Sequence, residues 1–102
     1  MIKKNDRNIT SFVSTLKRKM PLLTKSYKVR SLALFGSYVR GQQKKRSDLD
    51  VLVEFSRSPS LFTFIGLENY LSDQLGIKVD LVMKDALKPN IGKHILSEMM
   101  SV

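Results

Sequence analysis

LFGSYVRG at residues 34–41 and SDLDV at residues 47–51 are the two stretches that decide the fold of this chain. The second stretch opens a run of alternating apolar and polar residues that ends at Phe55, a pattern typical of a strand with one buried face. Asp48 and Asp50 stand two positions apart, so their side chains leave the same face, with Cα atoms about 6.5–7 Å apart. Such a pair can bind divalent metals about 3.5–4 Å apart. Ligation by oxygen alone favours Mg²⁺ or Mn²⁺ over zinc.

A pair of aspartates at the start of a strand is also common as a turn cap beside a solvated edge. Asp50, however, lies inside an apolar run, where a carboxylate without a partner is costly. A metal ion or a cationic side chain would remove that cost. The pair does not open an EF-hand loop, because Leu52 occupies the fifth position and no glycine follows it.

The glycine of the first stretch ends a predicted strand over residues 29–35, and a short helix is expected to follow. The start of a helix presents free N–H groups and the positive end of its dipole, which together bind phosphate. Gly36 allows close approach to the backbone, and Ser37 adds a hydroxyl donor. A Gly-Ser pair alone is equally typical of an ordinary turn. The pair becomes specific because ten residues separate it from Asp48.

The remaining apolar pattern predicts helices around a small sheet. Further elements are expected at these residues: helices over 9–20, 61–75 and 89–99, and strands over 49–55 and 77–82. Pro21 is predicted to end or kink the first helix, and Gly76 to end the second. The expected fold class is therefore α/β (α+β), with a small mixed sheet of three to four strands packed with helices. A chain of 102 residues fits a single domain over residues 1–102.

The net charge of +9 is unevenly distributed along the chain. Residues 1–46 carry thirteen Lys and Arg against one Asp, a net charge of +12, whereas residues 47–102 carry five against eight Asp and Glu, a net charge of −3. The asymmetry predicts an anionic partner such as nucleotide phosphates, nucleic acid or an acidic protein, although a solvated basic face explains it equally well. No helix-turn-helix, zinc knuckle or RNP motif supports nucleic acid, which ranks last.

Several classes of protein are excluded by what the sequence lacks. There is no cysteine, so disulfides and thiolate metal sites are ruled out. No apolar run approaches the ~18 residues that a membrane span needs. The segment over residues 1–7 is charged without an apolar region after it, which argues against a secretory signal. A cytoplasmic protein without a membrane partner is expected.

The two stretches together resemble a known family. FGS at residues 35–37, followed after ten residues by DLDV at 48–51, resembles the signature of the DNA polymerase β-like nucleotidyltransferase superfamily. More closely, GSYVRG, SDLDVLVEF and the later IKVDLV at 77–82 are similar to the minimal nucleotidyltransferase (MNT) domain proteins, over roughly residues 10–100. The resemblance implies the polymerase β-like fold and a metal-dependent transfer of a nucleoside monophosphate, commonly AMP, to a hydroxyl.

By that resemblance, three carboxylates would carry the catalysis and the metals. Asp48 and Asp50 would bind the Mg²⁺ that holds the triphosphate, with Mn²⁺ as the other candidate. Asp80 would be the third carboxylate, which helps to hold a second metal and activates the acceptor hydroxyl. Two ions are therefore implied, as attack at a phosphorus atom requires charge to be neutralised on both the entering and the leaving oxygen.

The resemblance also assigns residues to the nucleotide. Gly36 and Ser37 would hold the β- and γ-phosphates, and Arg40 would lie near the phosphates or steady the loop. ATP is the expected substrate on the resemblance alone. Two other polar residues are expected to have no such role: Glu54, which shares the face of Asp50, as a solvated side chain, and His94 as a surface or packing residue.

Members of the MNT family are often antitoxins of HEPN-domain ribonuclease toxins. The resemblance therefore implies a HEPN-domain partner, neutralised by attachment of AMP to one of its tyrosines, by binding, or by both. The alternative to an enzyme is a non-catalytic antitoxin that acts by complex formation. The presence of every glycine, serine and aspartate of the motifs favours the enzyme.

Overall fold

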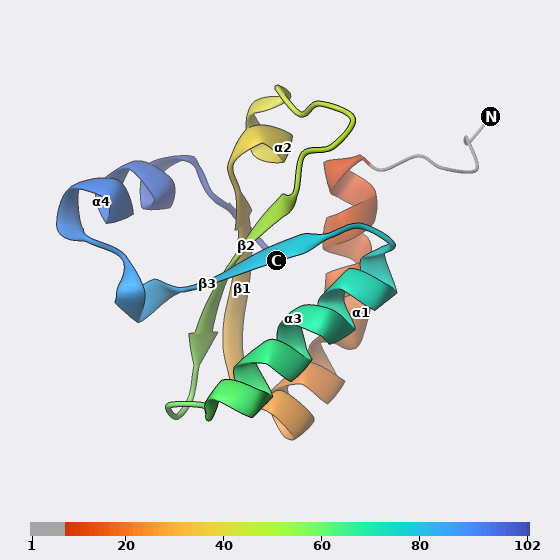
Figure 1. The fold of residues 1–102 in the computed structure, drawn as a ribbon, viewed down its shortest axis with the longest axis vertical. Coiled ribbons are helices and arrows are strands. Elements are labelled where there is room, and N and C mark those ends of the chain that lie inside the picture. Colours follow the sequence, from red (N-terminus) through yellow and green to blue (C-terminus); the bar gives the residue numbers. More distant parts are fainter. Residues whose placement is uncertain (1–7) are drawn as a thin grey trace.

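The computed structural model describes residues 8–102, which form a sheet with helices on both of its faces (Figure 1). The elements follow in this order: α1 (Ile9–Tyr27), β1 (Val29–Phe35), α2 (Ser37–Arg40), β2 (Leu49–Phe55), α3 (Leu61–Leu75), β3 (Val79–Met83), the 3₁₀ turn η1 (Lys84–Ala86), α4 (Pro89–Glu98) and β4 (Met100–Ser101). The predicted helices and strands are confirmed. The charged segment over residues 1–7, on which the argument against a signal depends, lies outside the described residues.

The sheet is mixed, as expected, and its strand order is β3-β2-β1-β4. β1 runs antiparallel to β2 and to β4, whereas β2 and β3 are parallel. The two-residue strand β4 was not predicted; it pairs Met100 with Leu34 and Ser101 with Ala33. β4 thus forms one edge of the sheet beside β1, one of the two inner strands.

The first helix does not end at Pro21 but continues to Tyr27. Proline removes one helical hydrogen bond and costs about 3 kcal/mol in a helix interior. Pro21 lies on the exposed side of α1, where water can bond the carbonyl that loses its partner. The opposite side buries Phe12, Leu16 and Leu23 against the sheet. Burial of such side chains contributes about 1.5–3 kcal/mol each, which outweighs the cost of the proline.

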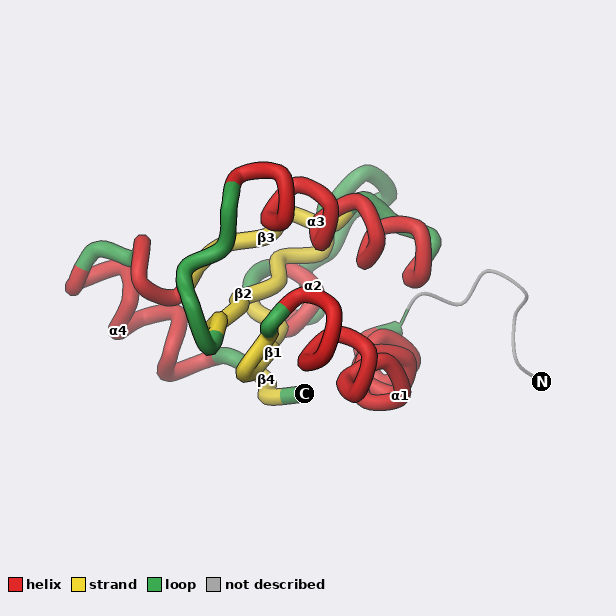
Figure 2. Tube along the Cα trace, turned by 90° about the horizontal axis from the view of Figure 1, so that it is seen from below, coloured by secondary structure: helices red, strands yellow, loops and turns green. Residues whose placement is uncertain are grey.

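Two apolar cores lie on opposite faces of the sheet. Figure 2 shows the helices on its two sides, with α1 and α3 on one side and α4 on the other. α1 and α3 cover one face, where the alternating residues Leu49, Val51 and Val53 of β2 are buried. α4 covers the other face, where Ile95 packs with Leu52 in the smaller cluster. Asp50 belongs to this second face, because it alternates with Val51 along the strand. On this second face Leu52 is buried between the acids Asp50 and Glu54, because Ile95 of α4 packs against it.

Side chains of α3 occupy the free edge of β3. The backbone N–H of Val79 donates to Ser72 Oγ at 3.0 Å, and that of Leu81 donates to Glu68 Oε2 at 2.9 Å. Edge strands expose such donors, and natural proteins protect them in several ways. Here the covering helix supplies the acceptors. Within residues 8–102, no helix has the length and apolar character needed to cross a bilayer.

Candidate active site

Asp50 and Asp80 lie side by side in a row that crosses three strands. Phe35 of β1 is the antiparallel partner of Asp50, and Asp50 is the parallel partner of Asp80. Residues paired in this way place their side chains on the same face, and neighbouring strands lie about 4.8 Å apart. The row is at the start of β2 and β3 and at the end of β1. The strand register therefore brings together two carboxylates that are thirty positions apart in the chain.

The carboxyl of Asp50 is in an environment that opposes its ionisation. Burial first, then the charges of Asp80 and Asp48, and a hydrogen bond with Asp80, raise the pKa of Asp50 from 3.8 to about 6. The guanidinium of Arg40 acts in the opposite direction without overcoming them. The three predicted carboxylates are thus close enough to interact, and they lack sufficient positive charge nearby. Strongly perturbed acids of this kind concentrate at functional sites.

Asp48 directly precedes β2 and points toward Lys78, which directly precedes the neighbouring strand β3. Its Oδ2 lies 3.9 Å from Lys78 Nζ, and both side chains are substantially exposed. Within the described residues, no three Asp, Glu, His or Cys side chains converge as a complete metal site. Asp48 therefore stands beside the Asp50–Asp80 pair without joining it.

Gly36 is fixed at its position by Asp50. Its φ of +82° lies in the region that glycine alone adopts readily. A Cβ placed on Gly36 would overlap Asp50 Oδ2 and would lie 3.0 Å from its Cγ. The absence of a side chain therefore lets the carboxylate rest directly on the backbone. This packing places the predicted phosphate-binding turn against the predicted metal ligand.

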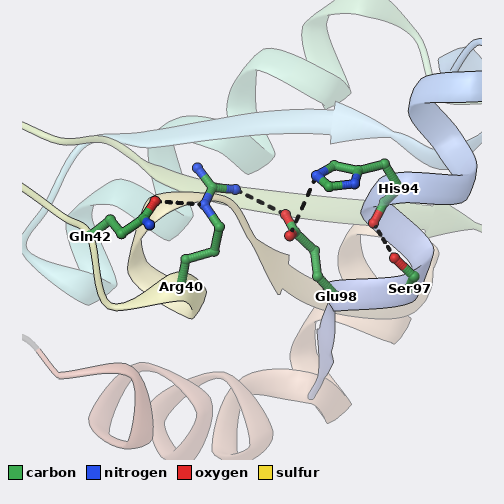
Figure 3. A network of polar contacts seen from close by, with 5 residues as sticks. All are labelled: Arg40, Gln42, His94, Ser97 and Glu98. Carbon is green, nitrogen blue, oxygen red and sulfur yellow. Dashed lines mark hydrogen bonds and ion pairs between the residues drawn. The ribbon is translucent and has the colours of Figure 1, made fainter.

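Ser37 begins α2 directly after Gly36, and Arg40 ends this short helix. Arg40 Nε donates to Gln42 Oε1 at 3.0 Å, and Nη1 donates to Glu98 Oε1 at 3.0 Å (Figure 3). The turn after Gln42 is closed by Ser47, whose Oγ accepts from the Lys44 N–H at 2.8 Å. Arg40 thus links Gln42 of the following loop to Glu98 at the end of α4.

The carboxylates fit a divalent metal by their chemistry. They offer only oxygen ligands, which Mg²⁺ and Mn²⁺ prefer. Burial and the charges of Asp80 and Asp48 raise the pKa of Asp50, and a bound cation would favour its ionised form. A cavity of about 220 Å³ lies elsewhere, at the ends of β2 and β3 near Phe55 and Asp85, and does not include these groups.

Comparison with known proteins identifies the family of the chain. The model of the nucleotidyltransferase domain family matches residues 13–101, nearly the whole chain. The chain belongs to this family. It is therefore a nucleotidyltransferase, as the resemblance of its two motifs implied, and the matched region includes all six residues predicted for the site.

Relatives of this nucleotidyltransferase include named adenylyltransferases. The protein adenylyltransferase MntA of Thermococcus cleftensis is 51% identical over 80 residues, which are 78% of this chain and 81% of the relative. A Methanocaldococcus jannaschii protein, named as a candidate protein adenylyltransferase, is 46% identical over 97 residues. That match covers 94% of this chain and 99% of the relative.

Solved structures share the fold of this nucleotidyltransferase. A candidate minimal nucleotidyltransferase has a TM-score of 0.80 at 25% identity, with 98% of this chain and 100% of that chain covered. A toxin–antitoxin structure with AMP-PNP has a TM-score of 0.67 at 24% identity and covers 83% and 70%. A chain of the complex between the tri-AMPylated HEPN toxin of Shewanella oneidensis and MNT antitoxin has a TM-score of 0.58 at 20% identity, with coverage of 90% of this chain and 66% of that chain.

Three contacts of this nucleotidyltransferase were missed from the sequence. Lys78 contacts Asp48 because Leu49 pairs with Val79 in the parallel ladder, and the sequence does not specify this register. Gln42 and Glu98 bind Arg40, but Glu98 is 58 positions away and no motif marks it. The only available signal was the charge of Glu98 at the end of the last predicted helix.

Proposed function

We propose that this nucleotidyltransferase transfers AMP from ATP to a hydroxyl of a partner protein, and that it thereby acts as the antitoxin of a HEPN-type ribonuclease toxin. Residues 1–102 would act as a single minimal nucleotidyltransferase domain in the cytoplasm. The observation that carries the proposal is the contact of Asp50 with both Gly36 and Asp80. It joins the proposed phosphate-binding turn to a pair of carboxylates at one end of the strands β1, β2 and β3.

Asp48, Asp50 and Asp80 would hold Mg²⁺, as two ions or with Mn²⁺ in their place. When bound, the metal neutralises charge on the triphosphate and on the leaving pyrophosphate. Asp50 is the central ligand, because it interacts with both other carboxylates. Asp48 would exchange its contact with Lys78, which is long and exposed and therefore weak, for the metal.

The chain's own groups would orient the substrates for in-line displacement. Gly36 and the N–H groups at the start of α2 would face the β- and γ-phosphates, and the Ser37 hydroxyl would donate to them. Arg40 would add positive charge at the same side. Asp80 would accept the proton of the acceptor hydroxyl as its oxygen bonds to the α-phosphorus. The bond from that phosphorus to the bridging oxygen breaks, and pyrophosphate leaves with the electron pair.

The partner and the nucleotide are proposed from the relatives. The names of the two relatives support protein as the acceptor and AMP as the group transferred. The toxin–antitoxin complexes that share the fold support a HEPN toxin as the partner and ATP as the substrate. The basic N-terminal half, with Arg40 and Lys44–Arg46 beside the site, suits an anionic substrate.

The test is transfer of label from radiolabelled ATP and Mg²⁺ to a purified HEPN-domain protein encoded beside this chain. The variant Asp48→Asn/Asp50→Asn is expected to lower the transfer more than about 100-fold, because both groups stabilise charge in the transition state. Asp73→Asn/Asp85→Asn is the matched control, since it removes two exposed carboxylates to which the proposal assigns no role. The control is expected to transfer label like the wild type.

Two results would contradict the proposal. Undiminished labelling by the Asp48→Asn/Asp50→Asn variant, with its fold verified by circular dichroism, would remove the assigned mechanism. Full neutralisation of the toxin by that inactive variant would instead support the alternative of a non-catalytic antitoxin. The second result is measured as ribonuclease activity of the toxin with each variant added.

A further inference from the structure

The geometry points to Glu98 as the residue that positions Arg40 toward the nucleotide phosphates, an inference that rests on the proposed function. Arg40 is held from two sides: Nε donates to Gln42 and Nη1 to Glu98, each at 3.0 Å (Figure 3). Neither hydrogen bond uses Nη2, which points away from Glu98 (Figure 3). The guanidinium also acts on the carboxyl of Asp50. Two nitrogens of the guanidinium, Nε and Nη1, are thus held by other side chains of the protein. The third nitrogen, Nη2, is left to donate to a ligand.

Both members of the Arg40–Glu98 pair are anchored to the same strand. Arg40 ends α2, which begins directly after β1 and Gly36. Glu98 ends α4, and the next residues enter β4, where Met100 pairs with Leu34 of β1. The N–H of Val102 also donates to the Leu32 carbonyl at 3.0 Å. The end of the chain therefore fixes Glu98 relative to the turn that carries the phosphate-binding groups.

The environment of the pair favours a fixed geometry over a loose surface contact. The side chain of Glu98 is 21% exposed and that of Arg40 is 41% exposed. Glu98 Oε2 also lies 3.6 Å from His94 Nε2, so both carboxylate oxygens have a neighbour. A partly buried ion pair is screened less than a solvated pair. The planar guanidinium loses little freedom for each hydrogen bond, so Glu98 orients it before the nucleotide arrives.

The opposite role for Glu98 predicts an effect of opposite sign. A carboxylate that only repelled the phosphates, or competed with them for Arg40, would weaken nucleotide binding, and its removal would strengthen it. A positioning residue strengthens binding, and its removal weakens it. The sign of the change in affinity therefore separates the two roles.

The experiment measures binding of AMP-PNP with Mg²⁺ by isothermal titration calorimetry. Glu98→Ala is expected to weaken binding about tenfold, the worth of one charged hydrogen bond. Glu98→Gln keeps an acceptor for Nη1 and is expected to remain within about twofold of the wild type. Glu98→Ala made in an Arg40→Ala background is expected to have no further effect, because Glu98 acts through Arg40.

Glu54→Ala is the matched control, since Glu54 also contacts an arginine, Arg30, but at the other end of β2. Its affinity is expected to equal that of the wild type, and thermal unfolding verifies the fold of each variant. Equal or tighter binding by Glu98→Ala, or a further loss in the Arg40→Ala background, would overturn the inference alone. Failure of the wild type to bind AMP-PNP would overturn the proposed function and this inference with it.

Discussion

Asp50 and Glu54 lie near opposite ends of β2 with their side chains on the same face, but the groups that surround them differ. At one end, Glu54 accepts a hydrogen bond from Ser31 Oγ at 3.2 Å and lies 4.0 Å from an Arg30 nitrogen. At the other end, burial and then the like charges of Asp80 and Asp48 raise the pKa of Asp50 to about 6. Glu54 therefore has a hydrogen-bond donor and a cation as neighbours. Asp50 has two other carboxylates as neighbours and packs against the turn at Gly36. The surroundings of an acid, and not its type, therefore distinguish the proposed catalytic end of the strands.

Asp80→Asn is expected to separate the two ends most strongly. Loss of the proposed proton acceptor should lower AMP transfer by about 10²–10⁴-fold, whereas Glu54→Gln should stay within about twofold. Both variants remove one charge from the same face of the sheet. The measurement is the initial rate of label transfer from radiolabelled ATP to the HEPN-domain partner. Equal rates for the two variants would erase the distinction between the ends.

Gly36→Ala tests the close packing at the catalytic end. Its Cβ would overlap the Asp50 carboxylate at a positive φ, so a loss of about 2–5 kcal/mol in unfolding free energy is expected. Gly76 has a similar φ of +67°, but a Cβ there meets nothing within 4 Å. Gly76→Ala should therefore cost only about 1–2 kcal/mol from backbone strain. Urea unfolding measures both variants, and equal losses would show that Asp50 does not constrain position 36.

Asp50→Asn is expected to stabilise the metal-free protein while it abolishes activity. The folded pKa of Asp50, about 6, exceeds its ordinary value of 3.8, so ionisation opposes folding above pH 6 and has no effect below pH 3.8. A shift of this size corresponds to about 3 kcal/mol, which solvent screening of the half-buried group reduces to about 1–2 kcal/mol.

The gain in unfolding free energy from Asp50→Asn should therefore be full near neutral pH and should fade as the pH decreases from about 6 to about 4. Urea unfolding in EDTA across this range measures it against the wild type. Added Mg²⁺ should stabilise the wild type and leave the variant unchanged. A variant less stable than the wild type at neutral pH would contradict the charge repulsion assigned to the carboxylates.

Glu54→Gln is expected to have the smallest effect on stability. The Arg30–Glu54 contact is long and its arginine is exposed, so its loss should cost no more than about 0.5 kcal/mol. High salt should remove even this difference, because exposed charges are screened. Thermal unfolding of the two proteins at low and high salt tests this. A loss as large as the change from Asp50→Asn would show that both ends are under similar electrostatic strain.

Local sequence signals were sufficient for most of the fold. The alternation over residues 49–55 and the glycines at positions 36 and 76 placed several of the strand and helix boundaries, and the fold of the family follows from the two motifs. The helix does not end at Pro21, because the free energy lost at the proline is smaller than the free energy gained from the tertiary packing of α1. β4 was missed because two residues without a clear alternation pair with β1 only through long-range contacts.

The site was predictable to the extent that its residues share motifs. Gly36, Ser37 and Asp48 lie in the motifs themselves, and the structure brings Asp50 and Asp80 together through the register of β2 and β3. The contacts that complete the surroundings depend on distant parts of the chain. Lys78 and Glu98 reach the site only because of the parallel pairing and the return of the C-terminal strand, and no local pattern encodes either.

The hydrogen bonds between α3 and the edge of β3 limit how a partner protein could bind beside Asp80. Ser72 and Glu68 already accept the hydrogen bonds of Val79 and Leu81, the residues directly before and after Asp80. An extended segment that presents its hydroxyl to Asp80 therefore finds those donors taken and cannot add itself to the sheet as a fifth strand there. A partner protein would then be recognised through side-chain contacts and not through strand pairing. The same hydrogen bonds protect the edge of β3 from pairing with a second copy of the chain.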